Sequence, residues 1–324
     1  MRALVVEDLL ADYAGCAVRD IDTPDPRPGE VLVRVRAAAV NFPDLLQTRG
    51  EYQHKPALPF IPGLEMSGDV VALGEGVTSL KVGDAVVGGA RIGGFSEYAV
   101  SPAAGLRLKP EALTYSQAAG YAVAYLTAYV ALVRRAQVEA GEWVLVHGAA
   151  GGVGLACVDL AQHLGCRVIA ASASDDKLAI IQRDYAPDAV VNVTGGFREA
   201  VKAITGGRGA DVVFDPVGGD VFDESTRCIA FNGRILSIGF TSGRQPVLPV
   251  NLALIKGFSV MGVRAGEYGR RFPEKGAENL AMVDAMAADG RISPHVSAAL
   301  PLAQWREGFD LLANRKVVGK AVLI

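Results

Sequence analysis

The sequence is poor in the features that mark several classes of protein. It has only 4 cysteines, at positions 16, 157, 166 and 228, and their spacing matches neither a disulfide framework nor a metal site. We expect them to be reduced thiols in a cytoplasmic protein. Basic residues are not in excess, since the formal net charge is -3 and the pI is about 5.9. This balance argues against a dedicated nucleic-acid surface.

Long apolar runs are also missing. We find no stretch of about 18 apolar residues, and therefore expect no membrane span. Residues 1–6 read as a strand rather than as a signal peptide. What is present is 50% hydrophobic residues, 21% charged residues and 38 glycines among 324 residues. That composition is typical of a soluble α/β protein, and the length is sufficient for two domains.

The stretch with the strongest pattern lies near the middle of the chain. Residues 143–146 form an apolar run, residues 147–154 (HGAAGGVG) a turn of small residues, and residues 155–164 have helical apolar spacing. A second apolar run follows at residues 167–171. The order of strand, glycine turn, helix and strand predicts a dinucleotide-binding unit, although Ala149 replaces the usual first glycine. We expect the pyrophosphate to lie against Ala150, Gly151, Gly152 and Val153.

The chain changes character on either side of this unit. Residues 1–122 contain short alternating segments, at 31–36, 68–72, 84–87 and 95–100, that predict a barrel-like β domain. An alanine-rich helical segment over 116–132 precedes an alternation of strands and helices that predicts a parallel sheet. Its strands are expected at 144–147, 168–171, 189–192, 212–215, 235–239 and 258–262. A helix at 279–288 and a segment at 294–300 follow, and residues 319–324 are expected to return to the first domain as a strand.

Six motifs in order carry a family resemblance. They are NFPD at 41–44, PGLEMSG at 62–68, VGDAV at 82–86, the glycine turn at 147–154, DPVGG at 215–219 and a closing Gly-Lys at 319–320. The sequence resembles the medium-chain dehydrogenase/reductase superfamily, and within it the zinc-free quinone oxidoreductase (zeta-crystallin-like) branch. The resemblance implies a Rossmann-type doubly wound parallel sheet, residues 123–264, inserted in a discontinuous, mostly β, GroES-like catalytic domain, residues 1–122 and 265–324.

Zinc separates this branch from its relatives. Metal-dependent members carry a cysteine and a histidine where this sequence has Asn41 and Leu64, and neither residue is a useful zinc ligand. Glu65 remains, but one carboxylate does not hold the ion. We therefore expect no metal site and no Lewis acid for alcohol oxidation. The acceptor should already be electrophilic, as quinones and activated enones are.

The nicotinamide cofactor is expected to be NADPH, with NADH less favoured. The acidic residue that would hold the ribose of NAD should end the second strand, where this sequence has Ser172. Together with Ser174 and Lys177, this residue could bind a 2′-phosphate. Two aspartates at 175 and 176 oppose this, as does Val193, where the family often has a tyrosine. Ser174 could alternatively serve only as a helix cap.

The resemblance implies further site residues. We expect Asn41, Asp44 and Tyr52 to position the substrate and manage its hydrogen bonds, in a cleft between the two domains. The alternatives are that Asn41 is a turn residue and that Tyr52 only packs. Further cofactor contacts are implied for Thr127, Val217, Gly239, Phe240, Val263 and Arg315.

The predicted activity is a zinc-independent, NADPH-dependent reduction of quinones or related activated alkenes. One alternative is an enone or 2-enoyl thioester reductase of the same superfamily. Another is a nucleotide-binding protein with a non-catalytic or RNA-binding role, which the acidic pI disfavours. A homodimer is expected, paired through residues 258–262, with a small-molecule substrate and no nucleic acid or membrane as partner.

Overall fold

The chain was analysed as a computed structural model that describes residues 1–89 and 92–324. It divides into two compact units. Unit 1 comprises residues 1–122, 287–290 and 294–324, and unit 2 comprises residues 123–286 and 291–293.

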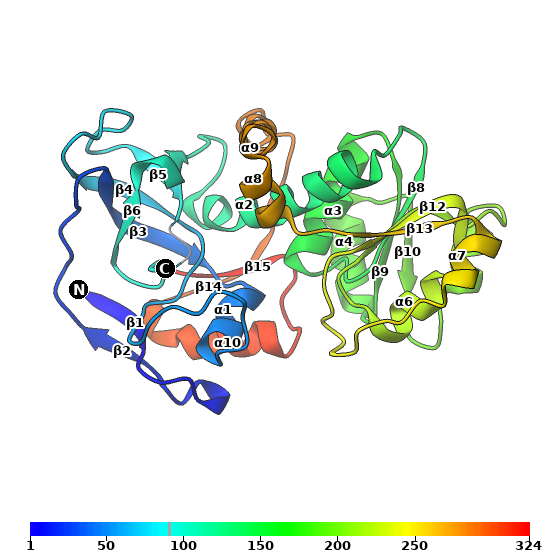
Figure 1. Cartoon of the computed structure of the whole chain (residues 1–324), viewed down its shortest axis with the longest axis horizontal. Coiled ribbons are helices and arrows are strands. Elements are labelled where there is room, and N and C mark those ends of the chain that lie inside the picture. The colour runs from blue at the N-terminus through cyan, green and yellow to red at the C-terminus, as the bar shows by residue number, and fades with distance from the viewer. Residues whose placement is uncertain (90–91) are drawn as a thin grey trace. The chain divides into compact units, whose positions relative to one another are not determined.

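Unit 1 is mostly β (Figure 1). Its main sheet has the strand order β14-β15-β3-β4-β5-β7, with β6 paired to β3, while β1 and β2 pair separately. The helices of this unit include α1 (Phe42–Thr48) and α10 (Trp305–Ala313). The strands are β1 (Arg2–Val6), β2 (Cys16–Asp20), β3 (Glu30–Ala39), β4 (Met66–Leu73), β5 (Ala85–Gly88), β6 (Tyr98–Pro102), β7 (Leu106–Leu108), β14 (Val296–Leu300) and β15 (Lys320–Leu323).

The C-terminal strand completes the sheet of unit 1. β15 runs antiparallel to β3, with Val322 opposite Ala39, as the sequence predicted. Figure 1 shows this red strand reaching the blue β3. The side chains that point inward from both ends of the chain share one core, which includes Val33, Phe309 and Leu323. Burial of this apolar surface ties the last residues to the first domain.

Unit 2 is a six-stranded parallel sheet with the order β10-β9-β8-β11-β12-β13. The predicted Rossmann-type sheet is therefore confirmed. Its strands are β8 (Trp143–Val146), β9 (Arg167–Ser172), β10 (Ala189–Asn192), β11 (Ala210–Asp215), β12 (Ile229–Ser237) and β13 (Ser259–Gly262). The helices between and around them are η3 (Val130–Ala136), α3 (Gly152–His163), α4 (Asp175–Tyr185), α5 (Arg198–Ile204), α6 (Gly219–Ser225), α7 (Val250–Lys256), α8 (Ala265–Arg271) and α9 (Pro273–Ala288).

The structure differs from the predicted domain division at two places, since both residues 265–286 and the short segment 291–293 belong to unit 2. Residues 265–286, which hold α8 and most of α9, belong to unit 2 rather than to the catalytic domain. A polar contact joins this segment to η3 of unit 2, where the Arg134 guanidinium donates to Asn279 Oδ1 at 2.7 Å and to Glu278 Oε2 at 2.8 Å. Asn279 is fully buried, so this contact lies inside the unit.

One helical segment meets the length and composition of a membrane span. Helix α2 (Tyr115–Tyr129) continues into η3, and 61% of the apolar window in Tyr115–Ala136 is buried inside the protein. Tyr121 and Ala128 on this segment are 0% exposed. A core helix of a globular protein has these properties, because its apolar side chains face protein rather than lipid.

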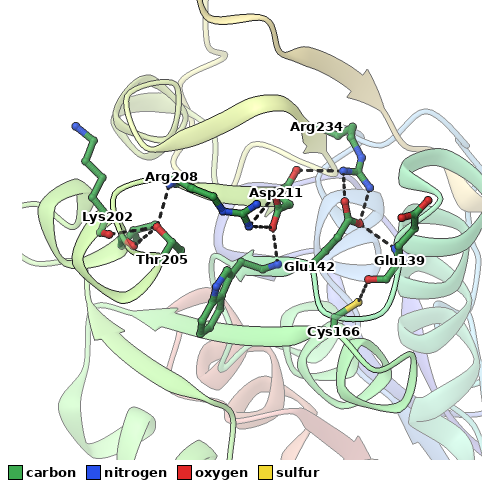
Figure 2. Close-up of polar contacts among 11 residues, drawn as sticks. Glu139, Glu142, Cys166, Lys202, Thr205, Arg208, Asp211 and Arg234 are labelled. Carbon is green, nitrogen blue, oxygen red and sulfur yellow. Dashed lines mark hydrogen bonds and ion pairs between the residues drawn. The ribbon is translucent and has the colours of Figure 1, made fainter.

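A charged cluster closes the amino-terminal edge of the unit 2 sheet (Figure 2). The Arg234 guanidinium on β12 donates to both oxygens of Glu142 at 2.7 Å, and to the Ala136 carbonyl of η3 at 3.1 Å. Asp211 accepts the Trp143 N–H at 2.8 Å. Burial raises the pKa of the Glu142 carboxyl, but the hydrogen bonds from Arg234 and from Glu139 N–H outweigh it and lower that pKa overall. The bidentate pair thus joins β8, β12 and η3.

Replacing Arg234 with methionine should therefore destabilise unit 2. Glu142 would remain largely buried without its partner, since the two side chains are only 14% and 21% exposed. We expect a loss of about 3 kcal/mol in the free energy of unfolding, measured by urea titration. The control is Arg183→Ala, whose side chain is 70% exposed beside Asp184 and should contribute less than about 1 kcal/mol. Equal losses in the two variants would contradict a stabilising role for the Arg234 pair.

Candidate functional site

The predicted glycine turn lies at the carboxyl end of β8. The turn leads into α3 with Gly151 as its N-cap, and a glycine cannot supply a side-chain cap to the first N–H groups of the helix. Gly154 must be glycine, because a Cβ there would lie 2.2 Å from the Gly148 carbonyl oxygen. The helix can therefore start directly against the turn. Its N–H groups and dipole make this end a suitable place for an anionic group such as a pyrophosphate.

The residues predicted to read a 2′-phosphate gather beside the end of β9. Ser172 Oγ accepts the Ser174 N–H at 3.4 Å, and Ser174 Oγ caps α4 by accepting the Lys177 N–H at 3.4 Å. Both hydroxyls keep their own protons for donation. Burial lowers the pKa of the half-buried Lys177. The Asp175 carboxylate accepts the Asn192 amide at 2.7 Å, which binds it to the end of the neighbouring strand β10.

The ends of β11 and β12 bring further predicted residues together. The buried Asp215 carboxylate accepts the N–H groups of Val217 at 2.8 Å and Gly218 at 2.9 Å, which fixes the turn after β11. A Cβ at Gly239 would lie 3.4 Å from the Pro216 carbonyl oxygen, so the turn after β12 lies against the first turn. Phe240 packs against the turn after β11, with a ring carbon 3.0 Å from the position of a Cβ built on Gly218. Its side chain remains exposed, at 44%.

Val263, Thr127 and Arg315 differ in how they are placed. Val263 follows β13 and donates its N–H to Ser237 O at 2.9 Å, so it lies at the same sheet edge. The Thr127 hydroxyl donates a hydrogen bond to the Val123 carbonyl within α2, at 2.7 Å. Arg315 belongs to unit 1, where it follows α10 with a left-handed φ of 55°. Unit 2 therefore contains most of the predicted cofactor residues, whereas Arg315 lies in unit 1, and the contacts of all of them with a cofactor stay predictions.

Unit 1 contains a second cluster of polar side chains, built around Asn41. The Lys320 ammonium donates to Asn41 Oδ1 at 2.6 Å and to Glu65 Oε1 at 2.9 Å. Asn41 Nδ2 donates to the same Glu65 oxygen at 3.1 Å and to the Ala39 carbonyl at 3.3 Å. These three residues are buried, each no more than 8% exposed as a whole. Glu65 and Lys320 belong to two of the motifs in the sequence, but no local pattern predicted their contact.

Asp44 lies beside this cluster and is fully buried. Its carboxylate accepts the Asn41 N–H at 2.8 Å, as half of a capping box on α1, and the N–H groups of Gly63 and Leu64 at 3.2 Å. Burial raises the pKa of this carboxyl to about 7, against the lowering effect of the Asn41 N–H, and the charge of Glu65 adds to the rise. Asp44 therefore binds main-chain N–H groups rather than side chains, and it holds the segment that contains Gly63 and Leu64 against α1.

Tyr52 lies in a bend after α1 and is half-buried. Leu9 packs against Gly50 on the same loop, with a side-chain carbon 3.0 Å from the Cβ position of that glycine. The loop is therefore held from the N-terminal side of unit 1. The role of Tyr52 as a hydrogen-bond donor to substrate stays a prediction.

The residues at the positions of the family's zinc ligands do not fit a metal ion. Asn41 and Glu65 offer oxygens, but both oxygens already accept from the Lys320 ammonium. Leu64 has no ligand atom. A tetrahedral zinc would need three ligands from cysteine, histidine and acidic residues. Among residues 1–89 and 92–324, no group of three such side chains is placed to hold one.

His147, on the turn after β8, has a structural role. Its imidazole Nε2 lies 2.9 Å from Ser225 Oγ, and its ring packs edge-on against Phe197. Burial lowers the pKa of this histidine to about 3. It is therefore a neutral core residue at physiological pH.

Comparison with known families matches both units. Residues 27–111 match the Alcohol dehydrogenase GroES-like domain, and residues 152–282 match the Zinc-binding dehydrogenase domain. Among curated proteins, a Quinone oxidoreductase-like protein 2 homolog from Nematostella vectensis is 40% identical over 297 residues. The match covers 91% of this chain and 81% of that protein.

Solved structures agree with this assignment. A mycobacterial protein solved as a complex with NADPH superposes with a TM-score of 0.89 at 31% identity, covering 100% of both chains. A structure described as an NAD-dependent alcohol dehydrogenase has a TM-score of 0.89 at 33% identity, covering 100% of this chain and 99% of that one. On the glycine turn, the two matched domains and these relatives, the chain is an oxidoreductase of the quinone oxidoreductase branch of the medium-chain dehydrogenase/reductase superfamily.

Proposed function

We propose that the protein is a cytoplasmic, zinc-independent reductase that uses NADPH to reduce quinones or related activated alkenes. The observation that carries the proposal is the pair of sites just described. The first is the N-terminus of α3, which has no side-chain cap and is followed in the sheet by Ser172, Ser174 and Lys177 at the end of β9. The second is the buried Lys320 ammonium, at the place where a metal-dependent relative has its metal ligands.

The preference for NADPH rests on the end of β9. No carboxylate occupies position 172, where an acid would bind the ribose hydroxyls of NAD. Ser172 and Ser174 retain hydroxyl protons, and Lys177 carries a positive charge on the same turn. The nearest acid on α4, Asp175, is bound to Asn192 at 2.7 Å. These groups favour a 2′-phosphate over a free hydroxyl.

The preference for an electrophilic acceptor rests on the donor set of unit 1. Asn41, Leu64 and Glu65 do not form a ligand set for a metal ion, which is the Lewis acid that would polarise an alcohol or an ordinary carbonyl. A quinone or enone needs less help, because delocalisation stabilises the charge that reduction creates. NADPH would supply the hydride when bound. The chain's own residues bind its phosphates through the turn at Gly151, orient the acceptor and exclude water.

Unit 2 also carries an exposed apolar face that fits a second copy of the chain. β13 is an edge strand, and such edges are usually covered or charged. Around it Phe231 and Leu254 are each 82% exposed, Val250 79% and Ile255 72%. An apolar patch of this kind at a sheet edge is typical of a homodimer interface.

The acceptor assay tests the proposed function directly. We expect rapid oxidation of NADPH with 1,4-benzoquinone or 9,10-phenanthrenequinone, and slow oxidation of NADH at the same concentration. Absorbance at the reduced nicotinamide band gives kcat/KM for each acceptor. Turnover only with an enone or a crotonyl thioester would instead favour the alkene reductase alternative. Tight NADPH binding with no turnover on any acceptor would overturn the enzymatic proposal.

Lys177→Ala should weaken NADPH selectively. Loss of a charged contact to the 2′-phosphate should cost about 1–3 kcal/mol in NADPH binding and leave NADH nearly unchanged. Calorimetric Kd values for the two cofactors measure the difference. Arg183→Ala, on the same helix but exposed, is the matched control. Equal weakening of both cofactors by Lys177→Ala would show that this lysine does not read the phosphate.

Leu254→Asp together with Phe231→Asp should convert the dimer to a monomer. Two carboxylates on the apolar face would have to be desolvated at the interface, which is costly. Sedimentation equilibrium should give twice the 33.9 kDa chain mass for the wild type and the single mass for the variant. A wild-type protein that sediments as a monomer at micromolar concentration would disprove this interface.

A further inference from the structure

The Lys320 ammonium is buried in unit 1 with two oxygen partners. It lies 2.6 Å from Asn41 Oδ1 and 2.9 Å from Glu65 Oε1, and the lysine and glutamate side chains are 10% and 4% exposed. Removing both charges from water carries a large desolvation penalty, and an apolar pair of similar volume is often at least as stable. The stability of this sheet therefore does not by itself explain a lysine at position 320.

The fold makes room for this side chain. Gly120 on α2 faces the lysine stem, and a Cβ there would lie 3.0 Å from Lys320 Cγ and 3.4 Å from its Cβ. Alanine is the better helix former by about 1 kcal/mol, so glycine within α2 has an intrinsic cost. The observed packing accounts for that glycine, because it lets the ammonium reach the interior.

The ammonium also determines how its partners are oriented. It has only donors, so Asn41 must turn its oxygen toward Lys320 and its Nδ2 toward Glu65 and Ala39. Asn41 is in turn the N-cap of α1, and its main-chain N–H binds Asp44. Asp44 holds the main chain at Gly63 and Leu64. One cation thus orders both N-terminal motifs of the family.

We propose that Lys320 is the resident cation of this site. Its ammonium takes the position between the Asn41 and Glu65 oxygens that a bound metal ion would need, and it positions both side chains for the reduction. Lys320 is a positioning residue whose catalytic importance rests on the proposed function. A chain without this ammonium contains an empty cation site that selects a primary alkylammonium ion.

The first experiment removes the ammonium and returns it as a separate molecule. Lys320→Ala deletes Cγ, Cδ, Cε and Nζ, which together correspond to n-propylammonium. We expect kcat with the preferred acceptor to fall about 10-fold to 100-fold, as for loss of other groups that orient site residues. The Kd for NADPH should change little. Added n-propylammonium should raise both kcat and the melting temperature of Lys320→Ala, but neither value for the wild type.

Three controls separate this role from general destabilisation. Uncharged 1-propanol has the same shape and should rescue neither value. Lys316→Ala, on the exposed segment just before β15, should behave as wild type. Lys320→Ala combined with Glu65→Gln should not respond to n-propylammonium, because the carboxylate that selects the cation is neutral. Equal rescue by 1-propanol, or rescue of the Glu65→Gln combination, would overturn the proposal, as would a loss confined to the Kd for NADPH.

A second pair of variants covers the case in which Lys320→Ala does not fold. Lys320→Met leaves Glu65 buried without its cation, whereas Lys320→Met with Glu65→Gln removes the unpaired charge. The double variant should therefore melt at a higher temperature than Lys320→Met alone. An equal or lower melting temperature would contradict the proposal. Because these melts need no substrate, they test the cation site even if the wild type reduces no acceptor in the panel.

Discussion

Parallel strands all end at one edge of a sheet, and unit 2 depends on this constraint. The glycine turn after β8, the serines after β9, and the turns after β11 and β12 come from distant parts of the chain. Their shared edge brings them together, and main-chain hydrogen bonds join neighbouring turns, with Ala149 N–H donating to Ala171 O at 3.1 Å and Thr241 N–H donating to Pro216 O at 3.1 Å. The bidentate ion pair of Arg234 and Glu142 lies near the opposite edge, where it joins β8, β12 and η3. The stabilising pair and the predicted cofactor-binding residues therefore lie at opposite edges of one sheet.

Unit 1 holds its candidate site in a different way, at the N-terminus of the short helix α1. It is held by one buried cation. Lys320 orients Asn41 and Glu65, and through the capping box Asp44 secures the main chain of residues 62–65. In metal-dependent relatives a bound ion organises these same two motifs. A covalently attached ammonium can replace the organising role of such an ion, but not its Lewis acidity, which agrees with an acceptor that needs no polarisation.

Local patterns made much of this predictable from the sequence. The strand, turn and helix around Gly151 could be recognised because apolar spacing and small residues occur within a few turns of chain. The start of α9 was missed because residues 273–278 are polar and include Gly276, although Pro273 suits the first helical position. β2 was missed since its second half is exposed and charged. The link between Glu65 and Lys320 spans 255 residues, and no local pattern reports a contact of that length.

The pairing of β15 with β3 has a consequence for synthesis on the ribosome. Unit 2 is almost continuous in sequence, so its sheet can close as soon as residue 286 and the short segment 291–293 emerge. Unit 1 forms later, because Ala38 and Ala39 of β3 lack their pairing partner until β15 has emerged. In that interval an apolar strand edge and the Glu65 carboxylate are both uncovered, which exposes the nascent chain to misassociation. When β15 pairs with β3, it covers that edge and places the Lys320 ammonium beside the Glu65 carboxylate.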